Sequence, residues 1–276
     1  MEWNRELEAA IRENPDDEIA WSILEDWTLE RGGIRARVIE LEKAGKKEET
    51  QSATWELETE VLGRDYSFTR SGGGCTWRAG YIVKCSIATT AALREGLLDR
   101  LFDLQCAKLM RALRVDIDVR DELASVTRRL AGTPVRELAI NAFWKPPTQV
   151  ATFDPQWLEP TAVERLHLMG RAIAVPYGPA LERLKSLWLT PGAPSDLRDL
   201  FSHANGLPSL VELAVYLTTL EHRHGVRPEL FEPIFDGTAA PALRHLYARD
   251  ASADLQGALM ARAAASRNVT LGFGYR

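Results

Sequence analysis

The chain has 276 residues, of which 45% are hydrophobic and 26% are charged, and this composition is typical of a folded globular protein rather than a disordered one. The formal net charge of −5 lacks the basic excess of most nucleic-acid-binding proteins, so we expect no nucleic-acid partner. No run of about 18 apolar residues occurs, so we also expect no membrane partner.

The start of the chain and the cysteines both bear on the compartment. The first residues, Met1-Glu-Trp-Asn, lack the basic and apolar regions of a signal peptide, which favours the cytoplasm. The three cysteines are Cys75, Cys85 and Cys106. Their spacing matches no usual zinc motif and their odd number argues against a disulfide framework, so we expect reduced, mostly buried thiols.

Three short helices are expected in the first 50 residues, which carry 14 acidic and 8 basic side chains. Asn14 suits the N-cap of the second helix and Pro15 its first position, and Gly32-Gly33 suits its end. Each helix has one apolar stripe. The stripes are Trp3, Leu7, Ala10 and Ile11; Ile19, Ile23, Leu24 and Trp27; and Ile34, Val38 and Leu41.

This N-terminal stretch resembles the bacterial repeat-companion domain, a module that precedes repeats. The segments that carry the resemblance are Leu7–Ile11, Asn14–Asp17, Leu24–Trp27, Leu29–Gly32 and Arg35–Leu41. The resemblance implies a small helical domain without known catalytic activity, followed by repeats.

The stretch between this domain and the repeats has fewer signals. Residues 43–52 are polar and charged, which predicts a helix end and a linker, and residues 53–63 could form a helix. Gly72-Gly73-Gly74 lacks the ending of a phosphate-binding loop and predicts a hairpin turn. From Trp77 to Ile87 apolar and polar residues alternate, which predicts the first strand of the sheet.

A short phrase, apolar-x-x-apolar-x-apolar, recurs along the rest of the chain. Its copies are Met110–Val115, Val135–Ile140, Val163–Leu168, Leu184–Leu189, Leu210–Val215 and Leu243–Ala248. Successive copies begin 25, 28, 21, 26 and 33 residues apart. A period in this range with this phrase resembles an irregular leucine-rich repeat.

The phrase predicts a strand with one buried face, because its last two apolar residues are two apart. One such strand cannot bury that face alone, whereas stacked copies share a core. We therefore expect an α/β fold: a short leucine-rich-repeat-like solenoid with a parallel inner sheet over residues 51–276, preceded by a helical domain over residues 1–50. The alternative is an α/β domain whose parallel strands begin similarly. Equivalent residues would form one buried ladder, namely Val83, Leu113, Leu138, Leu166, Leu187, Leu213 and Leu246.

Helices are expected between the strands near Leu97–Leu104, Leu123–Leu130, Leu197–Phe201 and Leu230–Phe235. The proline-containing connections at Pro146-Pro147, Pro155 to Pro160 and Pro176 to Pro179 are expected to be irregular. Residues 269–273 would form a closing strand.

The residues between the buried positions of each strand would form the exposed face of the sheet. Several belong to types enriched at protein interfaces. The sequence therefore predicts a protein-binding surface of Arg114, Arg165, His167, Trp188, Tyr216, His245, Tyr247 and Arg249. Alternatively, a loop or the N-terminal domain covers these rings.

No catalytic or cofactor motif is apparent. His222-x-His224 has no further ligand at a useful spacing, and nucleophile-elbow, zinc-protease and dinucleotide-binding patterns do not occur. We therefore expect no cofactor, no metal and no enzymatic activity. The expected function is recognition of a protein partner, and a regulatory or immunity subunit is a narrower form of it. The alternative is a hydrolase with a dispersed site at the strand ends.

Overall fold

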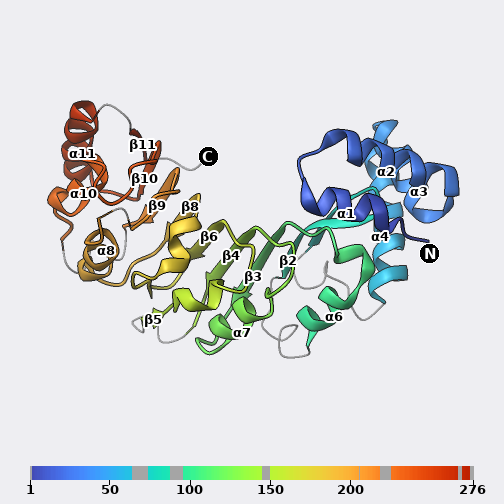
Figure 1. The fold of residues 1–276 in the computed structure, drawn as a ribbon, viewed down its shortest axis with the longest axis horizontal. Coiled ribbons are helices and arrows are strands. Elements are labelled where there is room, and N and C mark those ends of the chain that lie inside the picture. The colour runs from blue at the N-terminus through green and yellow to red at the C-terminus, as the bar shows by residue number, and fades with distance from the viewer. Residues whose placement is uncertain are drawn as a thin grey trace. The chain divides into compact units, whose positions relative to one another are not determined.

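The computed structural model describes residues 2–63, 74–87, 96–144, 150–204, 206–217, 225–266 and 269–273. These residues form a mixed α/β fold with a mostly parallel sheet (Figure 1), which confirms the predicted fold class at this level. No helix within these ranges is long and apolar enough to cross a membrane.

The chain divides into two compact units, which are described separately. Met1–Arg114 with Thr133–Val135 form the N-terminal unit, and Val115–Gly132 with Arg136–Arg276 form the C-terminal unit. The helices at the start of the chain thus share a unit with residues up to Arg114. The division between residues 50 and 51 stays a prediction.

The N-terminal unit contains the expected helices and a β-hairpin. Its elements are α1 (Arg5–Glu13), α2 (Glu18–Arg31), α3 (Gly33–Lys43), α4 (Lys47–Leu62), β1 (Gly74–Arg78), β2 (Tyr81–Ile87), α6 (Leu97–Asp103) and the 3-10 helix η3 (Gln105–Ala107). The linker expected over residues 43–52 is wrong from Lys47 onward. Glu48 and Glu49 lie in the first turn of α4, where acidic side chains favour a helix.

The start of α2 differs from the prediction. Asp17, not Asn14, is the N-cap, and its carboxylate accepts hydrogen bonds from the backbone N–H groups of Ile19 (2.9 Å) and Ala20 (3.1 Å). Asn14 instead ends α1. A carboxylate satisfies these free N–H groups and also interacts favourably with the positive end of the helix dipole.

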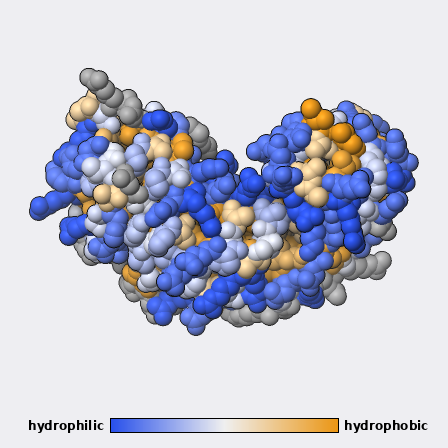
Figure 2. Space-filling view, viewed as in Figure 1, coloured by the Kyte–Doolittle hydropathy of each residue, from blue (hydrophilic) through white to orange (hydrophobic). Residues whose placement is uncertain are grey.

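The predicted stripe of α2 is also rotated. Trp21 and Leu24 are fully buried, whereas Ile19 is 74% exposed and Ile23 is 50% exposed, so the expectation that both isoleucines pack inward is wrong. The large indole of Trp21 determines the rotation, because its burial removes more apolar area from water than either isoleucine would. Figure 2 shows the apolar patch that this rotation leaves over α2.

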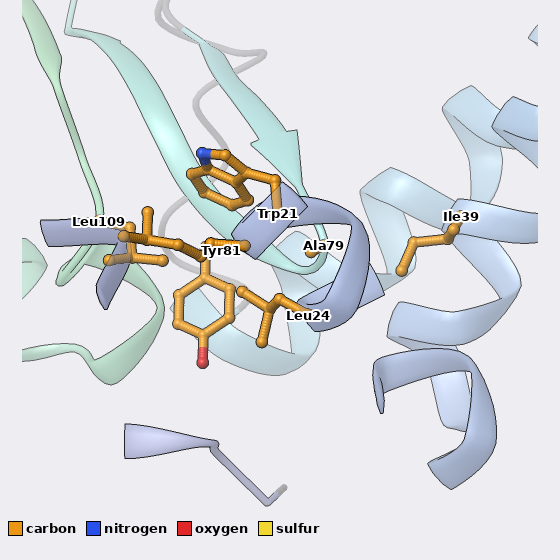
Figure 3. Close-up of a cluster of buried hydrophobic side chains, with 8 residues drawn as sticks. Trp21, Leu24, Ile39, Ala79, Tyr81 and Leu109 are labelled. Carbon is orange, nitrogen blue, oxygen red and sulfur yellow. The ribbon is translucent and has the colours of Figure 1, made fainter. Parts of the chain in front are cut away.

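The core of the N-terminal unit joins the helices to the hairpin (Figure 3). Its buried members are Ile11, Ala20, Trp21, Leu24, Ile39, Ala79, Tyr81 and Leu109. Trp3 packs edge-on against Tyr81 at a centroid distance of 4.9 Å. The helices therefore bury apolar surface of the hairpin as well as their own.

The hairpin turns at Ala79-Gly80. The alternation predicted one continuous strand over residues 77–87, and this prediction is wrong because the turn divides it. Gly74 begins β1, and the expected turn at Gly72-Gly73 lies outside the described residues. The strands β1 and β2 are antiparallel. The neighbour of β2 in the sheet is β3 (Ala112–Ile117). The N–H of Arg111, just before β3, donates to the carbonyl of Val83 in β2 (2.9 Å).

Arg35 fixes the hairpin turn to the helices. Its guanidinium is buried, donates to the backbone oxygens of Glu2 (2.9 Å) and Ala79 (2.8 Å), and lies 4.3 Å from the Trp3 ring centroid. Gly80, with φ of +75°, lies so close that a β-carbon there would collide with the Arg35 side chain. Glycine is therefore required at this position for both its conformation and its small size.

We expect Gly80→Ala to lower the free energy of unfolding by at least about 2 kcal/mol, because left-handed strain and overpacking add. Gly45→Ala is the matched control, since Gly45 has φ of +68° and nothing near its missing β-carbon. It should cost about 1 kcal/mol from strain alone. Urea unfolding of both variants measures the difference, and equal losses would show that Arg35 moves away freely.

The strands of the phrase form the sheet. They are β3 (Ala112–Ile117), β4 (Glu137–Ala142), β6 (Arg165–Met169), β8 (Ser186–Leu189), β9 (Glu212–Tyr216) and β10 (His245–Arg249), followed by β11 (Thr270–Gly272). In every copy of the phrase, the third residue is the first residue of the strand. In the C-terminal unit the order β4-β6-β8-β9-β10-β11 is parallel throughout, as predicted.

A ladder of leucines runs through this sheet. Leu138, Leu166, Leu187, Leu213 and Leu246 are paired in register and fully buried, and Leu271 of β11 pairs with Leu246. The predicted ladder is confirmed for these strands. In the N-terminal unit Leu113 is also buried, whereas Val83 is only partly buried.

The connections form a second layer on one side of the sheet. They contain α7 (Glu122–Arg128), η4 (Pro155–Leu158), η5 (Pro179–Arg183), α8 (Pro194–Phe201), η6 (Pro228–Phe231), α10 (Glu232–Phe235) and α11 (Ala253–Ala265). Successive members pack together, η4 on α7 and on η5, and η6 on α8 and on α11. Figure 1 shows α8, α10 and α11 on the same side of β8 to β10.

Most of these connections were predicted. Prolines at the starts of η4 and η5 leave only short 3-10 turns, as expected, and Pro146-Pro147 lie outside the described residues. The helix α11 and the short parallel pair β5 (Ala151–Thr152) with β7 (Ile173–Ala174) were not predicted. In α11 only Leu255 and Leu259 are buried, so its apolar pattern is weak.

Candidate functional site

The face of the sheet opposite the leucine ladder carries a row in which small residues flank the large rings. In register, the row is Ala139, His167, Trp188, Ala214, Tyr247 and Gly272. We call it the ring row. Neighbouring strands lie about 4.8 Å apart, so large side chains can cover the small neighbours. Ala214 is fully buried because it lies between Trp188 and Tyr247.

Trp188 is partly exposed and is held by three neighbours. Its indole N–H donates to Glu212 Oε1 at 2.6 Å. The His167 imidazole stacks on it with ring centroids 4.5 Å apart and planes 23° apart. The Arg249 guanidinium carbon lies 5.7 Å from its ring centroid. Together a hydrogen bond, a stacking contact and a cation–π contact restrict the indole to one orientation.

Tyr247 and Arg249 are more deeply placed than predicted. Tyr247 is 8% exposed and Arg249 is 1% exposed, so the expectation that both lie open to a partner is wrong. Tyr247 packs over Gly272, where a β-carbon would come within 2.7 Å of the tyrosine ring. The Arg249 guanidinium carbon lies 5.0 Å from the Tyr247 ring centroid. Small neighbours thus let the ring lie down on the sheet, and Arg249 packs on the ring.

The other predicted residues remain accessible to different degrees. Arg165 is exposed and forms an ion pair with Glu137 (3.8 Å). His245 is partly exposed and its ring is parallel to that of Tyr247 at 6.5 Å. Tyr216 is partly exposed and donates its hydroxyl to Met169 Sδ (3.7 Å). These three lie on the same sheet face as the ring row.

Arg114 is exposed on β3 but belongs to the N-terminal unit. The structure therefore brings together seven of the eight predicted residues on one face of the C-terminal unit. Their role in binding stays a prediction.

Glu212 and Ser186 were missing from the predicted set. The predicted set contained only aromatic and basic residues, so both were excluded. Glu212 is the first residue of β9, the strand next to that of Trp188. Diagonal neighbours on adjacent strands are within reach of a long side chain, so alignment of the phrases could have found Glu212. Ser186 contacts His167, with Oγ 3.4 Å from the imidazole Nε2.

The side chains of this face can make several kinds of contact with a ligand or partner. Among the residues that the structure describes, no three histidine, cysteine, aspartate or glutamate side chains are placed to hold a metal ion. His222 and His224 lie outside the described residues. Rings, the carboxylates of Glu137 and Glu212 and the cations of Arg165 and Arg249 can provide apolar contact, stacking and a few oriented hydrogen bonds.

Comparisons of the chain with protein-family models, with curated proteins and with solved structures gave no match. The resemblances to a repeat-companion domain and to leucine-rich repeats therefore stay predictions from the residues.

Proposed function

We propose that this protein is a non-enzymatic recognition module that binds a protein partner on the sheet face of its C-terminal unit. In this proposal the C-terminal unit is a short leucine-rich-repeat-like solenoid, the helices at the start of the chain are a repeat-companion domain, and the protein acts in the cytoplasm. A regulatory or immunity subunit that binds an enzyme is one form of this function.

The orientation of Trp188 is the observation that carries the proposal. A partly exposed tryptophan already fixed by Glu212, His167 and Arg249 loses little conformational freedom when a partner covers it. Binding energy in protein interfaces is concentrated in such large, preorganised residues, with tryptophan, tyrosine and arginine enriched among them.

The repeat character is supported by the correspondence between phrase and strand. Every copy of the phrase begins a strand at the same position, and the leucines at its fourth position are paired in register from β4 to β10. Stacked units of this kind present their inner strands as one continuous surface. That surface here contains the ring row.

The burial values divide the predicted residues of the C-terminal unit into three groups. We assign direct contact to His167, Trp188, Tyr216 and His245, which are partly exposed. Tyr247 and Arg249 are buried beside them, and Arg249 contacts the Trp188 ring. The exposed cation Arg165 would attract an acidic partner over a longer range and raise the association rate.

Capture from native cell extract tests the proposal with three baits: the wild type, Trp188→Ala and the matched control Trp55→Ala. Trp55 is 55% exposed on α4 in the N-terminal unit, so its loss removes a similar ring from a different surface. We expect one partner to be recovered with the wild type and with Trp55→Ala, but not with Trp188→Ala. Full recovery with a folded Trp188→Ala bait would reject this face.

A further inference from the structure

Two cysteines face each other across the β-hairpin of the N-terminal unit. Cys75 of β1 and Cys85 of β2 are directly opposite in the antiparallel register, and their sulfur atoms are 3.7 Å apart. Directly opposite residues in an antiparallel pair have α-carbons about 4.5–5.5 Å apart. That separation falls within the range of about 4.4–6.8 Å that a disulfide spans. A bond thus needs side-chain movement but no displacement of the strands.

We propose that Cys75 and Cys85 are a site of reversible thiol oxidation, at which a low-molecular-weight disulfide such as oxidised glutathione converts the pair to an intrachain disulfide. Cys106 keeps its thiol.

The exposure of the cysteines sets the order of events. Cys75 is partly exposed, whereas Cys85 and Cys106 are buried. Cys75 also borders a surface groove of about 900 Å³ between α4 and the start of β1. A small disulfide can therefore reach Cys75 from the groove but not the other two thiols. Cys75 is the entry thiol, and Cys85 resolves the adduct.

The chemistry balances without a metal or a bound cofactor. The Cys75 thiol loses its proton and attacks one sulfur of oxidised glutathione, whose S–S bond breaks and releases one glutathione that takes up a proton. The Cys85 thiol then loses its proton and attacks Cys75 Sγ. The bond from Cys75 to glutathione breaks, the Cys75–Cys85 bond forms, and a second protonated glutathione leaves. Two protein thiols are oxidised and one disulfide is reduced.

The surroundings of the thiols make this reaction slow at neutral pH. The hydrogen bond to Cys85, burial and the nearby Glu58 carboxylate raise the pKa of Cys75 above its ordinary value. Since the thiolate is the nucleophile, the rate of oxidation should rise with pH through the neutral and mildly alkaline range. Burial raises the pKa of Cys106 to about 12, which keeps that thiol protonated.

Oxidation would fix the hairpin against opening. The register of β1 and β2 shifts between Thr76 and Trp77, next to the cysteine pair. Trp77 in turn donates its indole N–H to Glu58 of α4 (3.1 Å). A covalent link at the cysteine pair would therefore hold the strand β1, which contacts α4, on its partner β2.

The test exposes the full-length protein to oxidised glutathione and then blocks and counts the remaining thiols after denaturation. We expect the number of reactive thiols to fall from three to one, and peptide mapping to find Cys75 joined to Cys85. The oxidised wild type should melt at a higher temperature than the reduced form, and dithiothreitol should reverse both changes. Three thiols remaining at mildly alkaline pH, or a Cys85–Cys106 link, would overturn the proposal.

Single variants check the order of events. Cys85→Ser should accumulate glutathione on Cys75, because nothing resolves the adduct, whereas Cys75→Ser should take up none. Cys106→Ser, the matched control, should form the Cys75–Cys85 disulfide like the wild type. A persistent adduct on folded wild type would show that Cys85 does not reach Cys75. Since the wild-type mapping requires no variant, a misfolded variant would not leave the proposal undecided.

Discussion

Leu187→Ala is expected to lower the free energy of unfolding by about 2–5 kcal/mol, the usual range for removal of a large aliphatic side chain from a packed core. Leu187 is fully buried and pairs in register with Leu166 on one side and Leu213 on the other. Its truncation leaves a cavity in the middle of the ladder, which the flanking strands cannot close without losing their hydrogen bonds. Urea unfolding followed by circular dichroism measures the loss.

Leu271→Ala is the matched control, because Leu271 belongs to the same ladder but lies partly exposed on the last described strand, β11. It should cost less than half as much as Leu187→Ala, since part of the side chain already contacts water. Equal losses in the two variants would show that the ladder does not form a common core. A Leu187→Ala loss below about 1 kcal/mol would show the same.

Trp188→Ala and Tyr247→Ala are expected to affect different properties. Trp188→Ala should weaken partner binding by at least about 2 kcal/mol, roughly 30-fold in Kd, with little change in melting temperature because the indole is partly exposed. Tyr247→Ala should instead destabilise the fold by about 3–5 kcal/mol, since its ring is 8% exposed and packs over Gly272. Calorimetric titration with the captured partner and melting curves separate the two effects.

Trp55→Ala again serves as the control, and both its affinity and its melting temperature should stay close to those of the wild type. Unchanged affinity in Trp188→Ala would move the binding surface away from the ring row. A large fall in the melting temperature of Trp188→Ala would show that the indole acts as core.

The strands were the most predictable part of this protein. A repeated phrase with apolar residues two apart has one physical solution, a strand with one buried face, and several copies in one chain can bury those faces by pairing in register. The leucines from Leu138 to Leu246 therefore lie where the phrase placed them. The proline-rich connections followed in the same way, because proline prevents a long helix there.

Helix rotation and helix caps were less predictable. In α2 the residues Ile19, Ile23 and Trp21 are all apolar, and the local sequence supports more than one buried stripe. Only the cluster that Trp21 shares with Leu24 and Tyr81 decided that Trp21 faces inward and both isoleucines face water. Likewise Asp17 and Asn14 are both good N-cap residues, and the choice between them depends on where α1 ends.

The sequence by itself determined the class of fold, the buried leucines of the ladder from Leu138 to Leu246 and which residues share the opposite face, because these follow from the period of the chain and from the burial of apolar area. Only the tertiary structure decided how far each of those residues is exposed. Exposure depends on neighbours distant in sequence: Ala214 and Gly272 leave room for Tyr247 to lie flat, Arg249 covers it, and Glu212 turns Trp188 to its orientation. The opposition of Cys75 and Cys85 has the same origin, since the turn at Ala79-Gly80 and the register shift between Thr76 and Trp77 together set which residues of the two strands pair.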